Sequence, residues 1–592
     1  MTVLSPEQGP TMSLNTTGIP TPRPPKRSVF DLARLPKIAL ALAATGFFVI
    51  FFFWPLFDVV LRSVSVDGVM NWADPQFTLD HYLRILQDDY LHLVEWRTVV
   101  LAFNSTLITL LLGFPVAYFI SRLPGKAAGI VLLLVLIPFQ VSIVVRLFAL
   151  TSILSPNGLL SQAGQAMGGE SFSLLYTQGG TLVGTVMYLL PYMILILYSG
   201  MTGVDHNVIL AARTLGANGV QTFVKVFLPL VRTSILSATL LCFILALSFF
   251  IVPAILGGPQ EQTVAVYIQQ QIDLFEWGVA SALGVVLLLA TLILYIAVIR
   301  IGGGFQAPGI GGQTKGVSQE QRFSWTPGTV FTGAVTLVAL AVLLLPVLIV
   351  FPLSVGETQT VVFPPRGFTL QWYGEVLTTT TWLNPIVRSL LVATLTGICS
   401  TALALYLARV VQTAKSERTK VMVSGLAFAP IITPAILLAI GIYAVELRLD
   451  LAGTIPGLVF AHTLVSFPLA FAMINTSLAS RGLDLETAAW TMGASRTTAF
   501  WKVTMRGMIP VLIGAFGLAF ITSWDEVVLA LFLQTGPVKT LPVTIYQYLE
   551  SGIVPTVPAI AAMLTLLVVA VIIIQRITQS RKAAAAARAD KK

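Results

Sequence analysis

The hydrophobic pattern of this chain is a series of long apolar runs separated by short polar segments. A helix needs about 20 apolar residues to cross ~30 Å of hydrocarbon, and twelve runs are about this long. Only helices satisfy their own backbone hydrogen bonds in that solvent when no closed barrel is present. The pattern therefore predicts an all-α polytopic membrane protein, with spans near 38–61, 98–120, 127–150, 180–200, 233–256, 279–299, 329–353, 387–408, 421–445, 454–474, 509–533 and 556–575.

Composition supports this class. Of 592 residues, 56% are hydrophobic and 10% are charged, and the mean hydropathy is +0.86. Soluble domains carry about 25% charged residues, so a large soluble domain has no room here. The two cysteines, Cys242 and Cys399, lie in apolar runs of different halves. We expect them to be buried small hydrophobic residues and to form no disulfide or metal site.

Lysine and arginine gather in the chain ends and in every second connection between the runs. The positive-inside rule then predicts that both termini and these connections are cytoplasmic. The net charge of +9 reflects this topology and attraction to anionic lipid rather than nucleic-acid binding. Eight basic residues fall outside the pattern: Arg62, Arg84, Arg97, Arg146, Arg366, Arg388, Arg448 and Lys539.

The polar segments predict five parts. Residues 1–37, rich in proline, serine and threonine, form a disordered cytoplasmic tail, and the span that follows is too long for a cleaved signal peptide. A glycine-rich cytoplasmic linker, 301–328, separates two permease domains of six spans each, 38–300 and 329–576, and 577–592 is a basic cytoplasmic tail. An even number of spans in each half makes the two halves parallel in the membrane.

One segment occurs twice, 277 positions apart, between the fourth and fifth spans of each half. Both copies read A-x-T-x-G-A, five residues, F-x-K-V. Alanine favours helix and the glycine ends it, so we expect two short cytoplasmic helices around a glycine turn. Such a surface helix can dock in a groove of a soluble partner and transmit motion. The candidate docking residues are Ala211, Ala212, Gly216, Leu228, Pro229, Ala488, Ala489 and Gly493.

These loops resemble the EAA coupling loop of ATP-binding-cassette (ABC) importer permeases, which reads E-A-A, three residues, G, nine residues, I-x-L-P. Leu210 and Thr487 stand where the glutamate belongs, with Glu486 one place early in the second copy. That copy also has Met505-Arg506 in place of Leu-Pro.

The resemblance implies a permease of the type I importer class with two halves fused in one chain, in the bacterial inner membrane. It implies two ATPase subunits on the loops and an extracytoplasmic solute-binding protein. The chain has no G-x-x-x-x-G-K-[ST] segment, so ATP and Mg²⁺ are expected on the separate ATPase. We expect this chain to bind no cofactor and to be no enzyme.

Further segments resemble the spermidine/putrescine permease pair. They are Val252-Pro253-Ala254-Ile255-Leu256-Gly257-Gly258-Pro259 in the first half and Ser523-Trp524-Asp525-Glu526-Val527-Val528 in the second. The first half departs from polyamine permeases at Phe249, where an acidic residue often stands. The resemblance implies a polyamine or another amine-bearing solute. Related branches carry aminophosphonates, opines or iron(III), which stay open as alternatives.

Ionisable residues inside a membrane are rare and usually functional. Asp525 and Glu526 lie about 12–15 residues into the eleventh run, ~18–23 Å from the inner surface if that run is one helix. We expect one of them to face the translocation path, with Trp524 offering a cation–π contact. A structural ion pair or a helix bend is the alternative.

Two more polar residues lie within spans. Arg146, near the outer end of the third run, either contacts solute or extends to the outer interface. His462 is expected to be a hydrogen-bonded core residue. A secondary transporter would give the same twelve-run profile, but it predicts no matched loops.

Overall fold

The computed structural model describes residues 35–69, 73–302, 326–481, 484–534, 538–552 and 554–570. The chain forms two compact units, Met1–Phe48 and Val49–Lys592. Helix α1 (Leu35–Phe48) is the described part of the first unit. Across the described ranges the elements are helices, and the β pairing is one isolated bridge between Ser65 and Phe77. The all-α prediction is confirmed.

Helices of the second unit occur in two series that follow the same order, except that α7 of the first series has no counterpart in the second. The first series, called the first half below, contains η2 (Val49–Phe53), α2 (Trp54–Ser63), α3 (Asp80–Gln87), α4 (Asp89–Arg122), α5 (Gly125–Gln140), α6 (Ile143–Leu154), α7 (Leu159–Ala166), α8 (Gln178–Thr202), α9 (His206–Thr214), α10 (Gly219–Thr222), η3 (Phe223–Phe227), α11 (Leu228–Leu247), α12 (Ile251–Leu256), α13 (Val264–Asp273) and α14 (Trp277–Gly302). The second half contains α15 (Pro327–Leu353), α16 (Gln371–Thr378), α17 (Thr380–Thr413), α18 (Glu417–Ile432), α19 (Ala435–Arg448), α20 (Ile455–Arg481), α21 (Asp484–Thr491), α22 (Arg496–Ala499), η4 (Phe500–Met505), α23 (Arg506–Trp524), α24 (Val528–Leu533), α25 (Leu541–Ser551) and a helix over 556–570.

The described residues hold ten helices long and apolar enough to cross a membrane, or eleven if one bent pair is counted as a span. The last predicted span is described as the helix over 556–570. Most of the predicted N-terminal tail (1–37) and linker (301–328), and all of the C-terminal tail (577–592), lie outside the described residues.

The third span of each half is not the continuous helix that its apolar run predicts. The chain leaves the helix between α5 and α6, and again between α18 and α19, where the two helices are bent by 99°. Pro138 and Pro430 lie in the last turn before each break, and Pro434 follows the second one. A proline removes a backbone donor and crowds the preceding turn, which explains why these runs bend.

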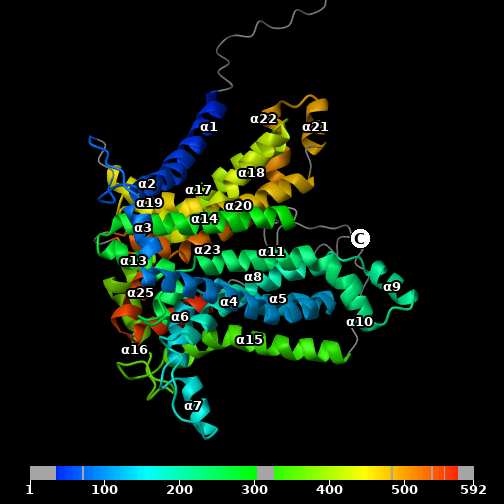
Figure 1. Ribbon diagram of the computed structural model, residues 1–592. Coiled ribbons are helices and arrows are strands. Elements are labelled where there is room, and N and C mark those ends of the chain that lie inside the picture. The colour runs from blue at the N-terminus through cyan, green and yellow to red at the C-terminus, as the bar shows by residue number, and fades with distance from the viewer. Residues whose placement is uncertain are drawn as a thin grey trace, which may run out of the picture. The chain divides into compact units, whose positions relative to one another are not determined.

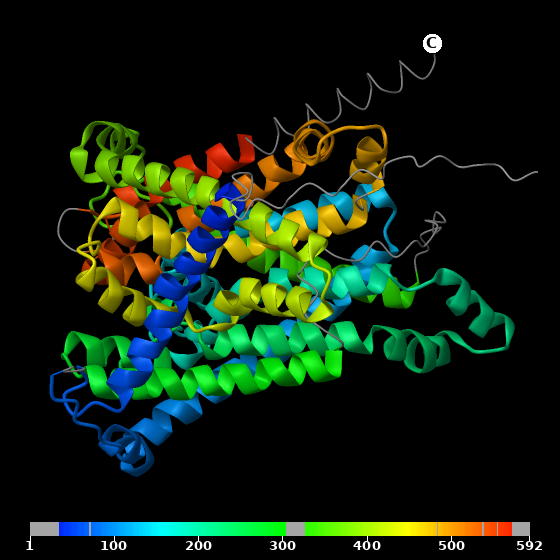
Figure 2. The same ribbon diagram turned by 90° about the horizontal axis from the view of Figure 1, so that it is seen from above.

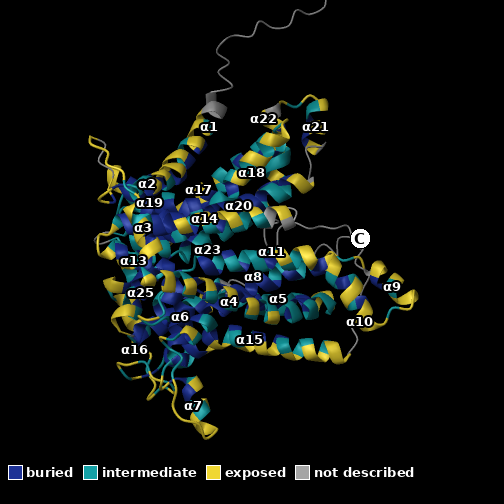
Figure 3. Cartoon of the chain, in the orientation of Figure 1, coloured by how far each residue is buried: buried dark blue, intermediate teal, exposed yellow. Residues whose placement is uncertain are grey.

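The two repeated loops leave the same end of the second unit, here named the loop end (Figures 1 and 2). Helices α3, α13, α16 and α25 lie at the opposite end (Figure 1). Between the ends, α4, α8 and α11 pack on one another in the first half, as α17, α20 and α23 do in the second. Buried residues concentrate between these helices (Figure 3). Cys242 is buried there, but Cys399 is exposed on α17, so the expectation of burial is wrong for Cys399.

The first helix of each series packs on the other half. Helix α15 packs on α4, α5 and α6, while α2 packs on α14 and on α19. These contacts interlock the halves, so neither half of the second unit is a separate bundle.

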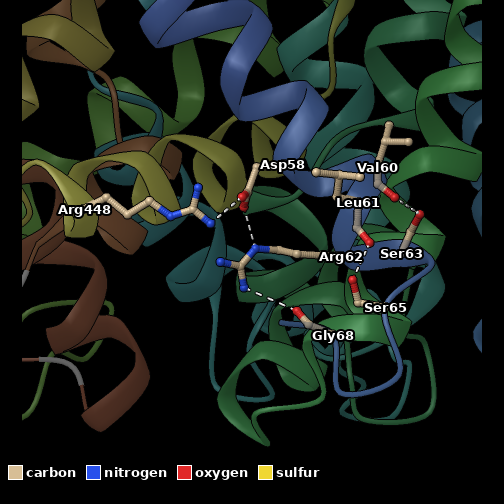
Figure 4. A network of polar contacts seen from close by, with 8 residues as sticks. All are labelled: Asp58, Val60, Leu61, Arg62, Ser63, Ser65, Gly68 and Arg448. Carbon is tan, nitrogen blue, oxygen red and sulfur yellow. Dashed lines mark hydrogen bonds and ion pairs between the residues drawn. The ribbon is translucent and has the colours of Figure 1, made fainter. Parts of the chain in front are cut away.

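An ion-pair network centred on the buried Asp58 joins α2 to α19, and Figure 4 shows it from close by. Asp58 accepts hydrogen bonds from Arg62 Nε at 2.5 Å and from Arg448 Nη2 at 2.8 Å. The Asp58 side chain is 2% exposed. Arg62 also lies over the Trp277 ring at 5.6 Å, and that ring stacks on Tyr443 of the second half. In the equivalent contact between α15 and α6, Ile349 stands at the position of Asp58. The ion pairs centred on Asp58 therefore have no counterpart there.

Candidate functional site

Each repeated loop folds as two short helices around a glycine turn, as the sequence predicts. The first repeated loop comprises α9, α10 and η3, and the second comprises α21, α22 and η4. After α9, the N–H of Ala217 donates to the carbonyl of Ala212 and the N–H of Gly216 donates to that of Arg213. Such a pair of bonds closes a helix end when the residue after the cap is left-handed.

The second turn repeats this geometry. Ala494 N–H donates to the Ala489 carbonyl and Gly493 N–H donates to that of Trp490. The φ angles are +89° at Gly216 and +90° at Gly493, and a β-carbon on either would meet no heavy atom within 4 Å. Backbone conformation, rather than space, therefore calls for glycine at both turns.

The next short helix of each loop begins at a capped residue. Asn218 Oδ1 accepts the N–H of Gln221 at 2.8 Å, and Ser495 Oγ accepts that of Thr498 at 3.1 Å. Both caps satisfy a backbone donor at the helix start, so both turns are set by local chemistry at matched positions.

Apolar side chains extend from both loops at matched positions. Leu215 and Met492 each immediately precede the turn glycine, and they are 88% and 82% exposed. Two further exposed pairs have the same spacing of 277 residues: Val208 with Leu485, and Val224 with Trp501. Exposed apolar residues grouped on a short helical hairpin are typical of a surface that a protein partner covers.

The second loop is tied to the body of the second half by an ion pair. Glu486 is 2% exposed, forms a salt bridge with Arg409 of α17, and accepts a 2.8 Å hydrogen bond from Thr504. Arg409 also lies over the Phe500 ring at 5.1 Å. In the first half the position of Glu486 is taken by Ile209, which is buried. Glu486 thus points inward, while Leu210 and Thr487, at the place of the glutamate in the E-A-A pattern, are exposed.

The other predicted loop residues differ in how far they are exposed. Ala211 and Ala488 are exposed, whereas Ala212 is half-buried and Ala489 is buried. Leu228 and Pro229 begin α11. The structure therefore brings all eight predicted loop residues to the two hairpins or to the helix that follows.

The prediction that Asp525 and Glu526 lie within one continuous helix is wrong. Helix α23 ends at Trp524 and α24 begins at Val528, so both carboxylates lie at a break. Glu526 turns back on its own chain, where its two oxygens accept the N–H groups of Leu529 and Ala530 at 3.0 Å each. These bonds cap α24. Glu526 thus lies at a bend in the helix, which the sequence analysis named as the alternative to a carboxylate that faces the translocation path.

Asp525 reaches across to the first half. Its Oδ1 accepts the N–H of Ile143 at 2.9 Å, at the first residue of α6. The two breaks, one in the third span of the first half and one in the fifth span of the second, therefore meet at this carboxylate. The equivalent of Asp525 in the first half is Ser248, and that of Glu526 is Phe249.

Arg146 lies near Asp525, Tyr188 and Tyr192. It is 2% exposed, so its side chain does not extend to the interface. Among the residues that the structure describes, no hydrogen-bond acceptor lies within reach of its Nε or Nη1. The hydroxyls of Tyr188 and Tyr192 are 3.3 Å apart, and the Tyr188 ring packs 4.4 Å from that of Phe249.

The last two candidates take part in packing. Trp524 stacks on Phe520 with ring centroids 6.1 Å apart. His462 is buried and its Nδ1 lies 2.8 Å from Ser523 Oγ, with Nε2 3.7 Å from Glu526 Oε2. The structure thus gathers Asp525, Glu526, Trp524 and His462 around one break and brings Arg146 to it from the other half.

Sequence reasoning missed two polar sites. Asp58, the centre of the network in Figure 4, lies inside an apolar run, which was a usable signal. The inward direction of Glu486 was less accessible, because its partner Arg409 also fits the cytoplasmic excess of basic residues.

Comparison with known proteins gives a family. The model of a family described as "Binding-protein-dependent transport system inner membrane component" matches residues 102–303 and again residues 400–583. The two matches together cover more than half of the chain.

Two individual relatives, PotB and PotC, agree with this match. The spermidine/putrescine transport system permease protein PotB of Escherichia coli K12 is 29% identical over 42% of this chain and 91% of its own length. PotC of the same strain is 28% identical over 35% of this chain and 78% of its own length. A chain in the crystal structure of a bacterial ABC transporter involved in alginate import is 18% identical, with a TM-score of 0.40 over 46% of this chain and 97% of that one. The chain belongs to the family of inner-membrane components of binding-protein-dependent transport systems, as an ABC importer permease with two halves fused into one polypeptide.

Proposed function

We propose that this chain is the membrane path of an ATP-driven importer for a polyamine, such as putrescine or spermidine, or for another small amine-bearing solute. A binding protein delivers the solute at the opposite end, and one ATPase subunit docks on each repeated loop. ATP and Mg²⁺ are held by those ATPases. Both termini and the loop end are cytoplasmic.

The paired loops are the observation that carries the ATPase part of the proposal. Two hairpins with the same glycine turn present exposed apolar side chains at matched positions, at the same end of the molecule. Closure of two partners on them would move α11 and α23 directly, because η3 and η4 continue into those helices. A secondary transporter needs no such pair of docking surfaces.

Two observations support an amine. PotB and PotC both have spermidine and putrescine in their names, and Asp525 places a carboxylate between the halves. An ammonium group that binds Asp525 would compete with the Ile143 N–H. The contact between the two breaks would then loosen as solute passes.

A zwitterionic solute, such as an aminophosphonate or an opine, is a second candidate. Arg146 is buried beside Asp525 with two donors that lack acceptors among the described residues. Buried donors without acceptors are costly, and an anionic group on the solute would accept from these two. An amine and an anion on one molecule would then match the two charges of the site.

Uptake of labelled putrescine and spermidine, in cells that express the permease with its ATPase and binding protein, tests the solute. We expect ATP-dependent uptake that falls about tenfold or more in Asp525→Asn at unchanged membrane levels, because the variant loses the charge that attracts an ammonium group. A tenfold loss corresponds to about 1.4 kcal/mol of free energy. Glu526→Gln is the matched neighbour, and it should retain more uptake because its role is to cap α24. Absence of polyamine uptake in the wild type, with uptake of an aminophosphonate or opine, would reject the polyamine and support the second candidate.

A further inference from the structure

A polar cavity lies at the opposite end of the second half, outside the polar cluster around Asp525. It has a volume of about 500 Å³. It opens between the first turns of α17 and one face of α25, with Lys539 from the segment before α25. The lining residues are Thr380, Thr381, Asn384, Pro385, Arg388, Lys539, Thr544, Gln547, Tyr548 and Ser551.

Two basic side chains line this cavity. Arg388 and Lys539 are two of the basic residues that the positive-inside rule leaves unexplained, and they converge here although 151 positions separate them. The other described lining residues are neutral, and most carry hydroxyl or amide groups. Glu550, on α25, is exposed and is not among the lining residues. Two cations among neutral donors favour an anionic group with several acceptor oxygens.

The depth of Arg388 identifies the source of that anion. The apolar stretch 389–408 of α17 lies between Arg388 and Arg409, and Arg409 contacts Glu486 of the second loop at the loop end. Arg388 and Arg409 are 21 residues apart, which is ~31 Å at 1.5 Å per residue and matches the ~30 Å hydrocarbon thickness. Arg388 therefore lies at the headgroup level of the leaflet away from the loops.

The surroundings of the cavity fit the same level. Val387 and Leu390, the neighbours of Arg388 on α17, are 60% and 50% exposed and continue into a lipid-facing apolar stripe through Leu391 and Ile398. Tyr548 lines the cavity, is half-buried, and stacks on the buried Trp382 with ring centroids 5.0 Å apart. Tyrosine is enriched at membrane interfaces. Lys539 donates to Gln547 at 2.9 Å, which holds its ammonium group beside α25.

We propose that this cavity binds the phosphate group of a phospholipid in the extracytoplasmic leaflet, with Arg388 and Lys539 as its two cationic contacts. The acyl chains lie along the exposed stripe of α17. The inference rests on the proposed function only for the name of the leaflet. The first half lacks such a site, because Gln262 stands at the position of Lys539.

Native mass spectrometry of the purified full chain tests the site. The probes are phosphatidylglycerol, diacylglycerol, which lacks the phosphate, and glycerol 1-phosphate, which lacks the chains. We expect the wild type to retain phosphatidylglycerol but neither of the other two. Arg388→Gln/Lys539→Gln should weaken retention about tenfold or more, because both cationic contacts to the phosphate are lost.

Two further variants keep the test decisive. Arg388→Lys retains the charge but loses the planar guanidinium, so its lipid retention should lie between that of the wild type and that of the double variant. Arg97→Gln changes the equivalent arginine of the first half and should leave retention unchanged. Equal loss in Arg97→Gln, or no loss in the double variant, would overturn the site.

Other occupants would appear as distinct results. Tight binding of glycerol 1-phosphate would make this a site for soluble phosphate esters and reject a lipid. Unchanged lipid retention with weakened docking of the cognate binding protein would assign the cavity to a protein carboxylate instead. Neither result depends on ATPase association, so failure of this inference is separable from failure of the proposed function.

Discussion

At the scale of single residues, direction decides what each charge does. The sequence does not show in which direction Glu486 and Glu526 point. In the structure Glu486 pairs with Arg409, and Glu526 caps α24. Asp525 is the carboxylate that reaches the other half. Spacing along a chain cannot show this, because the direction of each carboxylate depends on the helix ends around it and, for Asp525, on a donor 382 positions away.

The buried pair of the second loop should be worth more than an exposed one. Glu486→Gln removes the charge that Arg409 faces, and we expect a loss of about 2 kcal/mol, seen as a fall of a few degrees in the apparent Tm of the purified protein. Glu417→Gln breaks the exposed Lys420 pair, where Glu417 is 80% exposed, and should change the Tm little. A Tm that responds equally to both variants would contradict the anchoring role of Glu486.

The two turn glycines should be sensitive to any side chain. Gly216→Ala or Gly493→Ala forces a left-handed alanine, at about 1–2 kcal/mol per turn, and should weaken ATPase binding measured by titration of the purified ATPase. Gly219→Ala is the matched control, because Gly219 lies in the same loop with open space around it and an ordinary φ. Equal effects of Gly216→Ala and Gly219→Ala would show that backbone conformation is not the cause.

At the scale of elements, apolar runs gave the spans but not their interruptions. A hydropathy profile reads a broken helix and a straight one alike, so α5–α6, α18–α19 and α23–α24 were each predicted as one helix. Pro138 and Pro430 were signals for two of these breaks. The break after Trp524 has no proline; there the carboxylates of Asp525 and Glu526 accept freed backbone donors. The loops, in contrast, were predictable because their caps and glycine turns are local.

The joint between α2 and α19 should depend on Asp58. Asp58→Asn leaves Arg62 and Arg448 without their shared anion, and we expect the apparent Tm to fall by several degrees because breaking a buried pair costs about 3–5 kcal/mol. Arg448 is 37% exposed on its side chain, so Arg448→Gln should cost less. A double-mutant cycle on these two positions measures the coupling, and additive losses would mean that the pair does not join the helices.

At the scale of the molecule, the two halves repeat one design but differ in their charges. Interlocked first helices and matched loops follow the repeat. The repeated segment in the sequence predicted the loops, whereas the interlocking was not predicted. The ionic joint at Asp58 and the carboxylates at the fifth-span break occur in one member of each equivalent pair. Internal repetition therefore predicts the helices and loops that the two halves share. The charged residues in which the halves differ, and which would select a solute, have to be located in the structure.

Co-purification of ATPase subunits with Leu215→Asp, Met492→Asp and the double variant tests the central claim most directly. Each substitution places a charge on an exposed apolar position of one loop and leaves the membrane helices untouched. The variants should therefore reach the membrane as the wild type does. The account predicts about two ATPase subunits per wild-type chain, about one with either single variant, and none with the double variant. Retention of two subunits by the double variant would contradict the claim that these loops hold the ATPases.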